Sequence, residues 1–279
     1  STTFDEVTRK MRELGRRPNT IRNMLNMVKK VLKAGRRDQW LPENFLVDLE
    51  PVTVPKYTAK LLTLDQIREL ANHAGLYGPA ALLGGICGLR SAEICALMWA
   101  DFAGDPPILT IARQNRTAPG GGHTIKEGTK GRRGSQRKRA IPLIPEVLAA
   151  VNALPKRSVY LFPDPQNMDL PLNIYDMRLI MQQAMKDAGV PVVRVHDLRH
   201  SAGNALKQAG VQVKTIADIL GHSTVSVTQD IYQQTITNEM IEAMSKLNPA
   251  ARFGSISLIS QMPRNGSGPH RDARRRRHR

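Results

Sequence analysis

The chain of 279 residues is 41% hydrophobic, which is enough for one large domain or two modest ones. Its 41 basic and 24 acidic residues leave a formal net charge of +17, which favours a polyanionic partner, nucleic acid before an acidic membrane. Aromatic residues reach only 4%, which disfavours binding of single strands through stacked bases. The sequence shows neither a signal peptide nor an apolar run long enough to span a bilayer, and its two cysteines are expected to be buried thiols in a reducing cytoplasm.

The first 57 residues are predicted to form basic helices followed by a linker. Apolar residues recur at a helical spacing between Ile21 and Leu32. Five basic residues crowd the end of that helix, namely Lys29, Lys30, Lys33, Arg36 and Arg37. They form either a solvated helix face or a surface for DNA, and the overall charge favours DNA. Residues 51–57 hold two prolines and no periodicity, which marks a linker.

A larger domain is predicted over residues 58–250, and its first helices lead to an arginine in an apolar setting. Thr63 and Gln66 have the spacing of a capping box at a helix start. The apolar run over residues 80–86 predicts a buried helix.

Arg90 follows this run directly and is costly to bury without an anion or a partner. Ser91 is expected to cap the next helix, and Glu93 can pair with Arg90. Taken alone, the pair is more readily interpreted as a structural ion pair than as a functional one.

Three short strands are predicted next, over residues 108–111, 123–125 and 139–144. The fold class is therefore mixed α+β and mainly α, with a small antiparallel three-stranded sheet. A flexible basic loop precedes the last strand, and three of its side chains are expected to touch DNA phosphates: Arg132, Arg133 and Arg137.

Residues 194–234 gather the remaining candidates. His196 and Arg199 are three residues apart, so on a helix they share one face. A helix over residues 201–213 and a second one over residues 213–220, which stops at Gly221, are predicted to present His222. Tyr232 follows ten residues later. These polar side chains make chemical sense if they converge on a phosphodiester.

The order of these motifs resembles the tyrosine recombinase (phage integrase) family. The matching segments are G-L-R-S-A-E-I from Gly88, H-D-L-R-H-S from His196, L-G-H-S from Leu220, and Tyr232. The resemblance covers roughly residues 60–245 and extends weakly back to about residue 17. It implies a helical catalytic domain preceded by an all-α core-binding domain. Residues 1–57 match only the last part of such a domain, so its front half is expected to be missing.

The resemblance also assigns roles to side chains. The implied catalytic set is Tyr232, Arg90, Arg199, His196, His222 and Lys130. The choice of Lys130 as the lysine stays open against Lys126 and Lys138, while Glu93 and His200 would support the site. No cofactor and no metal are expected. His196 and His200 have the spacing of a zinc helix, but Arg199 between them would repel a dication.

The activity implied is site-specific DNA recombination through a 3′-phosphotyrosyl intermediate, for integration or excision of a phage or mobile element in a bacterial cytoplasm. Expected partners are double-stranded attachment sites, further copies of the chain in a tetramer on DNA, and an accessory DNA-bending factor. Two alternatives stay open: a non-catalytic DNA-binding protein on the same fold, and a relaxing enzyme of the type IB topoisomerase kind.

The C-terminal part is expected to contain one more helix and a tail. Apolar residues between Ile236 and Leu247 form a helical stripe that docks either on a neighbouring protomer or on its own chain. Residues 251–279 are predicted to be a disordered basic tail that binds nucleic acid without specificity.

Overall fold

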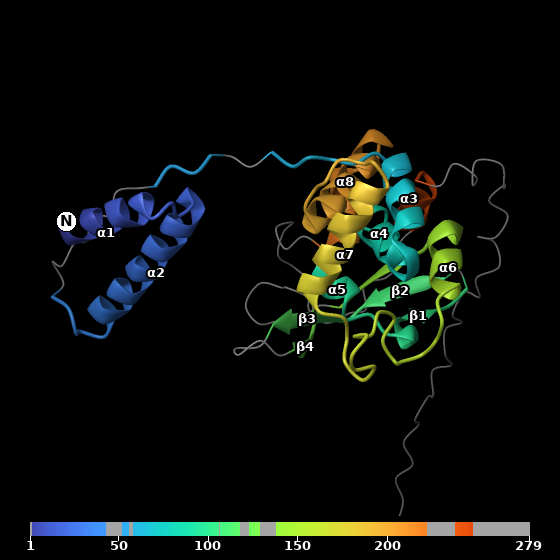
Figure 1. The fold of residues 1–279 in the computed structure, drawn as a ribbon, viewed down its shortest axis with the longest axis horizontal. Coiled ribbons are helices and arrows are strands. Elements are labelled where there is room, and N and C mark those ends of the chain that lie inside the picture. The colour runs from blue at the N-terminus through green and yellow to red at the C-terminus, as the bar shows by residue number, and fades with distance from the viewer. Residues whose placement is uncertain are drawn as a thin grey trace, which may run out of the picture. The chain divides into compact units, whose positions relative to one another are not determined.

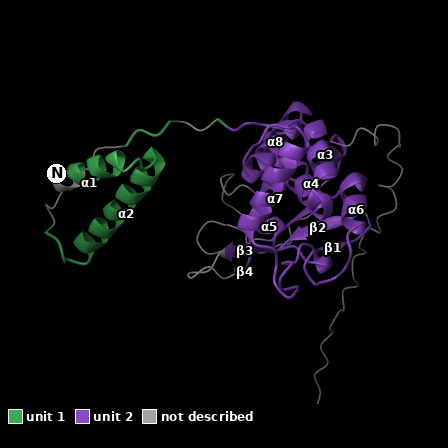
Figure 2. Cartoon of the chain, viewed as in Figure 1, with its two compact units in different colours: residues 1–58 green, residues 59–279 purple. Residues whose placement is uncertain are grey.

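The computed structural model of the chain describes residues 2–42, 52–55, 58–105, 107–117, 123–128, 138–221 and 238–247. The chain divides into two compact units, residues 1–58 and residues 59–279 (Figure 2). No helix in the described ranges is long and apolar enough to cross a membrane.

The first unit is a pair of helices, α1 (Thr2–Glu13) and α2 (Pro18–Arg37). Proline occupies the first turn of α2, where its missing N–H costs nothing. Ile21 and Leu25 are buried at the contact, with Met11 and Val28 packed against them. The basic residues predicted at the end of α2 are all exposed, as an ion-binding surface requires.

The second unit is built around α4 (Gly78–Gly85), every residue of which is buried. Its neighbours are α3 (Leu64–His73), α6 (Pro145–Asn152) and α8 (Val195–Gln208). The remaining helices are α5 (Ser91–Ile94), α7 (Ile174–Asp187), α9 (Val213–Leu220) and α10 (Asn238–Ser245), with short 3-10 turns at Gly75–Tyr77 and Trp99–Asp101. In Figure 1 the strands lie at the lower end of this unit, away from the upper ends of α3 and α8.

The predicted capping box is confirmed at the start of α3. The Thr63 hydroxyl accepts from the Gln66 backbone N–H at 3.2 Å, and the Gln66 side chain accepts from the Thr63 N–H at 3.0 Å.

The strands form two small antiparallel sheets. One has the order β1-β2-β5, from Phe102–Ala103, Ile108–Ile111 and Arg139–Pro142. The other is a hairpin of β3 (Arg113–Thr117) and β4 (His123–Glu127). The mainly helical class with a three-stranded sheet is thus confirmed. However, β1 supplies the third strand, because the segment at residue 123 pairs locally with β3 instead.

One helix begins well before its periodicity-based start. The helix expected over residues 201–213 is α8, which begins at Val195 and therefore carries both His196 and Arg199. Gly210, with a φ of +74°, lies just beyond its end. The stripe on α10 packs in the core of its own chain, against α9 and β5, with Met240 and Met244 buried.

Candidate functional site

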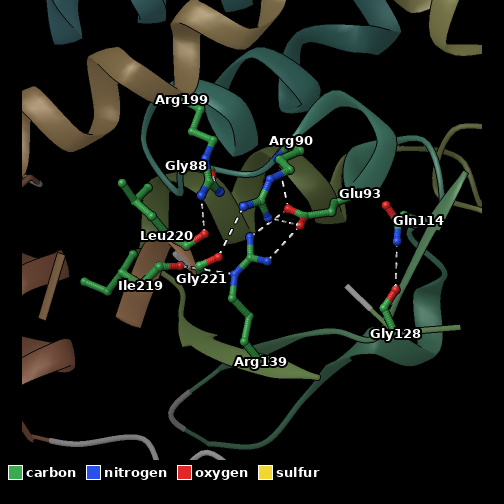
Figure 3. Close-up of polar contacts among 10 residues, drawn as sticks. All are labelled: Gly88, Arg90, Glu93, Gln114, Gly128, Arg139, Arg199, Ile219, Leu220 and Gly221. Carbon is green, nitrogen blue, oxygen red and sulfur yellow. Dashed lines mark hydrogen bonds and ion pairs between the residues drawn. The ribbon is translucent and has the colours of Figure 1, made fainter. Parts of the chain in front are cut away.

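The C-terminal end of α9 collects three arginines that come from three different elements (Figure 3). Three consecutive backbone carbonyls each accept a bond from a different guanidinium. The bonds run from Arg139 Nε to Ile219 O at 3.2 Å, from Arg199 Nη2 to Leu220 O, and from Arg90 Nη2 to Gly221 O at 3.2 Å. Carbonyls at a helix C-terminus lack partners within the helix and carry the negative end of its dipole, so they favour cations. The helix end is therefore a template that brings the positive charges together.

Arg199, on α8, is buried and has no carboxylate partner among the described residues. Its Nη1 donates to the Gly88 carbonyl at 2.6 Å and its Nη2 donates to the Leu220 carbonyl, so both bonds go to backbone oxygens. Burial, with repulsion from Arg90 and Arg139, lowers the pKa of Arg199 to about 9, while Glu93 raises it. The guanidinium remains charged at neutral pH, and an incoming anion would relieve this cost.

Arg90 stands immediately before α5, and Glu93 holds it from the first turn of that helix. The Glu93 carboxylate accepts from the Arg90 backbone N–H at 2.9 Å and from Arg90 Nη1 at 2.7 Å. Ser91, expected to cap α5, is instead the first residue of the helix. Arg90 occupies the cap position, and the Glu93 side chain accepts from its backbone N–H. The Arg90 side chain keeps 24% of its surface exposed. Of the three arginines, it is therefore the one with the most access to a ligand.

Arg139, at the start of β5, forms a buried two-bond ion pair with Glu93. Its Nη1 and Nη2 donate to the two carboxylate oxygens at 2.9 Å and 2.7 Å, and both side chains are 3% exposed. Burial alone raises the pKa of Glu93, but the bonds to Arg139 and the charges of Arg139 and Arg90 outweigh it and lower the pKa to about 2. Glu93 is thus a carboxylate shared between Arg139 and Arg90.

Sequence reasoning did not single out Arg139, although a signal was present. In a strand, alternate residues face the same side, so Arg139 shares its face with the buried Ile141. A charged residue in phase with the core positions of a strand indicates a buried partner.

Two glycines allow the close approach of these elements. Gly88 and Gly221 have φ values of +71° and +65°, in the left-handed region that favours glycine. A Cβ on Gly88 would lie 2.2 Å from Leu220 Cδ2, and one on Gly221 would lie 2.9 Å from Arg139 Cδ. The carbonyls of both glycines accept bonds from the arginines, so the backbone there is part of the site.

His196 and His200 lie one helical turn apart on the exposed side of α8. Their rings meet edge to face with centroids 5.0 Å apart. Burial lowers the pKa of His196, and the charges of His200, Arg199 and Arg90 lower it further. A neutral imidazole beside a guanidinium can accept a proton. Within the described ranges, no cluster of three or more histidine, cysteine or acidic residues could hold a metal.

Both ends of the predicted basic loop are anchored beside β2. The Gly128 N–H donates to the Ala112 carbonyl at 2.6 Å, and the Gly128 carbonyl accepts from Gln114 Nε2 at 3.1 Å (Figure 3). At the other end, Arg139 pairs with Ile111 in the sheet. The loop therefore starts beside Ala112, which follows β2, and finishes at Arg139 of the arginine cluster.

Several predicted residues lie outside the described part of the chain. They are Lys130, Arg132, Arg133, Arg137, His222 and Tyr232, together with the tail from residue 251. Of the two alternative lysines, Lys126 is exposed on β4, and Lys138 is exposed next to Arg139. His222 directly follows Gly221, whose carbonyl accepts from Arg90.

Comparison with known proteins gives a family match and several similar folds. Residues 61–239 match the model of the phage integrase family. The fold is similar to the Tn1549 transposon integrase in complex with transposon right end DNA, with a TM-score of 0.67, 21% identity, and coverage of 80% of this chain and 77% of that one. It is also similar to a lambda integrase dimer bound to a COC′ core site (TM-score 0.58, 14% identity, 83% and 82% covered). A lambda integrase tetramer bound to a Holliday junction gives a TM-score of 0.56 at 14% identity, with 82% and 66% covered. A comparison with curated protein sequences finds no match.

Proposed function

The chain belongs to the phage integrase family of tyrosine recombinases, and we propose that it is a site-specific recombinase that cleaves and rejoins duplex DNA through a 3′-phosphotyrosyl intermediate. Its role is integration or excision of a phage or mobile element, in the cytoplasm of a bacterial host. No cofactor takes part.

One observation supports the proposal most directly. Arg90 and Arg199 donate to the consecutive carbonyls of Gly221 and Leu220 at the end of α9, which holds the two guanidinium groups close together. Arg199 has no acidic partner among the described residues, and Arg90 retains exposed surface. Two planar guanidinium groups can each donate to the non-bridging oxygens of one phosphate. They would stabilise the charge that builds on a five-coordinate phosphorus.

In the proposed reaction, the Tyr232 hydroxyl oxygen attacks the phosphorus and the bond from phosphorus to the 5′ oxygen breaks. The phenol has an ordinary pKa near 10, so it needs an acceptor for its proton, and the neutral imidazole of His196 supplies one. His222 donates to the same phosphate oxygens, and His200 supports His196. Because the phosphotyrosyl ester retains the energy of the broken bond, the 5′ hydroxyl of a second strand can reverse the step without ATP.

The departing 5′ oxygen needs a proton, and we assign its delivery to Lys130 in the loop anchored beside β2. An ammonium group close to DNA can act as the general acid. Arg132, Arg133 and Arg137 in the same loop contact phosphates. The position of the loop supports this role, because the loop ends at Arg139 in the arginine cluster.

The first unit acts as the last part of a core-binding domain, and the basic end of α2 contacts the DNA backbone. The active form on DNA is a tetramer of this chain at an attachment site, with a DNA-bending factor as an accessory partner. The tail from residue 251 adds non-specific affinity through its arginines.

The test is covalent capture on nicked duplexes whose sequences are randomised around the nick. A nick just 3′ of the scissile phosphate lets the 5′-hydroxyl fragment diffuse away and traps the adduct. The parent chain should form a protein–DNA adduct that survives denaturing electrophoresis, and Tyr232→Phe should form none. The matched control Tyr175→Phe removes an exposed phenol on α7 and should leave adduct formation unchanged. Arg199→Lys should slow adduct formation by about 100-fold, because a single ammonium nitrogen cannot replace the several planar donors of a guanidinium group.

The same assay separates the alternatives. DNA binding without any adduct would support a non-catalytic DNA-binding protein and contradict the proposal. Adducts without sequence preference, together with relaxation of supercoiled plasmid by a monomer, would support a topoisomerase.

A further inference from the structure

Arg139 has chemistry unlike that of the two arginines proposed to hold the phosphate. Every nitrogen of its guanidinium donates to a protein oxygen: Nη1 and Nη2 to Glu93, and Nε to the Ile219 carbonyl. Its side chain is 3% exposed, and its charge is balanced by a carboxylate of equal burial. Because all three nitrogens are engaged and the charge is balanced by Glu93, Arg139 has no spare charge with which to bind DNA itself.

The contacts of Arg139 nevertheless link it to Arg90 and to the C-terminal end of α9. Through Glu93 it is linked to Arg90, because the oxygen Oε1 that accepts from Arg139 Nη1 at 2.9 Å also accepts from Arg90 Nη1 at 2.7 Å. Through Ile219 it is linked to the end of α9. The Cα of Gly221 packs so closely on the Arg139 side chain that a Cβ there would meet three of its atoms within 3.2 Å.

We propose that Arg139 is a positioning residue of the recombination site: it holds the Glu93 carboxylate that orients Arg90, and it holds the end of α9 from which the chain continues to His222. This inference rests on the proposed function and adds a residue to it. Figure 3 shows Arg139 reaching Glu93 on one side and Ile219 on the other.

The geometry explains why an arginine is needed at this position. A guanidinium can donate to both carboxylate oxygens and to a carbonyl at the same time, because its donors form a rigid planar fork. A lysine at position 139 keeps the charge but offers a single nitrogen. Glu93 would then lose at least one of its two bonds from position 139, and its bonds to Arg90 alone would hold it less firmly.

The first experiment compares Arg139→Lys with the parent chain and with Arg68→Lys. Arg68 makes a similar set of bonds elsewhere, donating to both oxygens of Glu146 at 2.8 Å and 3.1 Å and to the Leu247 carbonyl at 3.2 Å. Two readouts are taken far below the melting temperature of each variant: the rate of adduct formation at saturating nicked duplex, and the affinity for orthovanadate, a mimic of five-coordinate phosphorus.

For Arg139→Lys we expect adduct formation to fall by about 100-fold and orthovanadate affinity by about 10-fold, while DNA affinity stays within about 3-fold. Arg68→Lys should lower the melting temperature without affecting either readout. A purely structural role predicts instead that Arg139→Lys recovers parental rate and affinity at temperatures where it is fully folded, and that result overturns the proposal.

The second experiment tests the link through Glu93 and does not depend on the folding of Arg139→Lys. Glu93→Gln removes the same link from its other end, so it should reproduce the loss in both readouts. The double variant should be no worse than the more severe single variant, because both changes break one chain of contacts. Full activity of Glu93→Gln, or additive losses, would contradict the route from Arg139 to Arg90.

The two readouts also separate this inference from the function on which it rests. If the parent chain binds orthovanadate but forms no adduct on any duplex, the recombinase proposal fails, and the orthovanadate series still decides the role of Arg139. If adducts form but orthovanadate does not bind, the adduct series decides it. A parent chain that does neither overturns both proposals.

Discussion

At the scale of single residues, the site is a balance of charges in a buried setting. Arg90, Arg139 and Arg199 converge on one helix end, and Arg90 and Arg139 share the carboxylate of Glu93. A cluster with this excess of positive charge is suited to an anion, since its own electrostatic cost falls when the anion binds.

The first residue-scale prediction concerns pH. Burial, then His200 and Arg199, lowers the pKa of His196 below its ordinary value of 6.5. The neutral ring is therefore present at pH 7 and is lost only as the pH falls below 6.5 through the lowered pKa. Adduct formation should decline on that acid side. His200→Gln removes one source of repulsion, so the decline should begin at a higher pH.

The pH profile of His73→Gln serves as the control, because His73 lies on α3 beside Glu69. It should match that of the parent chain. A midpoint above 6.5, or one that does not respond to His200→Gln, would show that His196 is not the proton acceptor.

A second residue-scale prediction concerns the glycine that ends α9. Gly221→Ala places a methyl group 2.9 Å from Arg139 Cδ in a backbone with a φ of +65°. Gly210→Ala faces a similar φ of +74° with nothing within 4 Å. Denaturant titration should show a loss of about 1–2 kcal/mol for Gly210→Ala from the left-handed backbone alone. Adduct formation should stay at the parental rate in that variant.

Gly221→Ala should lose more unfolding free energy than Gly210→Ala and should slow adduct formation at least about 10-fold, because its carbonyl holds Arg90. Equal effects of the two substitutions on the rate would argue that the position of the α9 end is unimportant for cleavage.

At the scale of elements, the short helix α9 contributes to the site through the backbone carbonyls at its C-terminal end. α9 has eight residues, and its C-terminal carbonyls hold the arginines. α10 packs against α9 and β5 and buries Met240 and Met244. The packing of α10 thus supports the helix end on which the site is assembled.

The element-scale prediction is that α10 stabilises its own chain. Met244 is 1% exposed, so Met244→Ala should lower the free energy of unfolding by about 2–5 kcal/mol. The same substitution at Met168, which is 41% exposed, should change it by less than about 0.5 kcal/mol. The loss should be the same at low and high protein concentration. A stability that rises with concentration would indicate docking of α10 on a neighbouring protomer.

At the scale of the whole molecule, the described cations are of two kinds: exposed ones, such as those at the end of α2, and the buried guanidinium groups of Arg139 and Arg199. Exposed cations supply affinity that depends on salt, whereas buried ones act on one phosphate at short range.

The whole-molecule prediction is a steep salt dependence of DNA binding. Each neutralised phosphate contributes about 0.9 to the slope of log affinity against log salt. Changing Lys29, Lys30, Lys33 and Arg36 to glutamine should therefore reduce the slope by roughly 3 to 4. Arg9→Gln is the control, because Arg9 is paired with Glu13 at 2.7 Å and should contribute little. A slope that does not change in the fourfold variant would remove α2 from the DNA interface.

The sequence by itself determined several of the helices and the cap of α3. Thr63 and Gln66 cap α3 as predicted, and α9 has the predicted bounds, because both depend on residues only a few positions apart. The order of the motifs was also enough to identify the family and to place Arg90, Glu93 and Arg199 on the list of candidates.

Only the tertiary structure decided how those residues meet. Arg90 and Gly221 are 131 residues apart, Arg199 and Gly88 are 111 apart, and Arg139 lies 46 residues from Glu93. Periodicity and propensity report on neighbours within a turn or a strand, so they cannot pair such distant groups. The same limit explains why β1 rather than β4 completes the three-stranded sheet, since the choice of strand partner is a long-range contact.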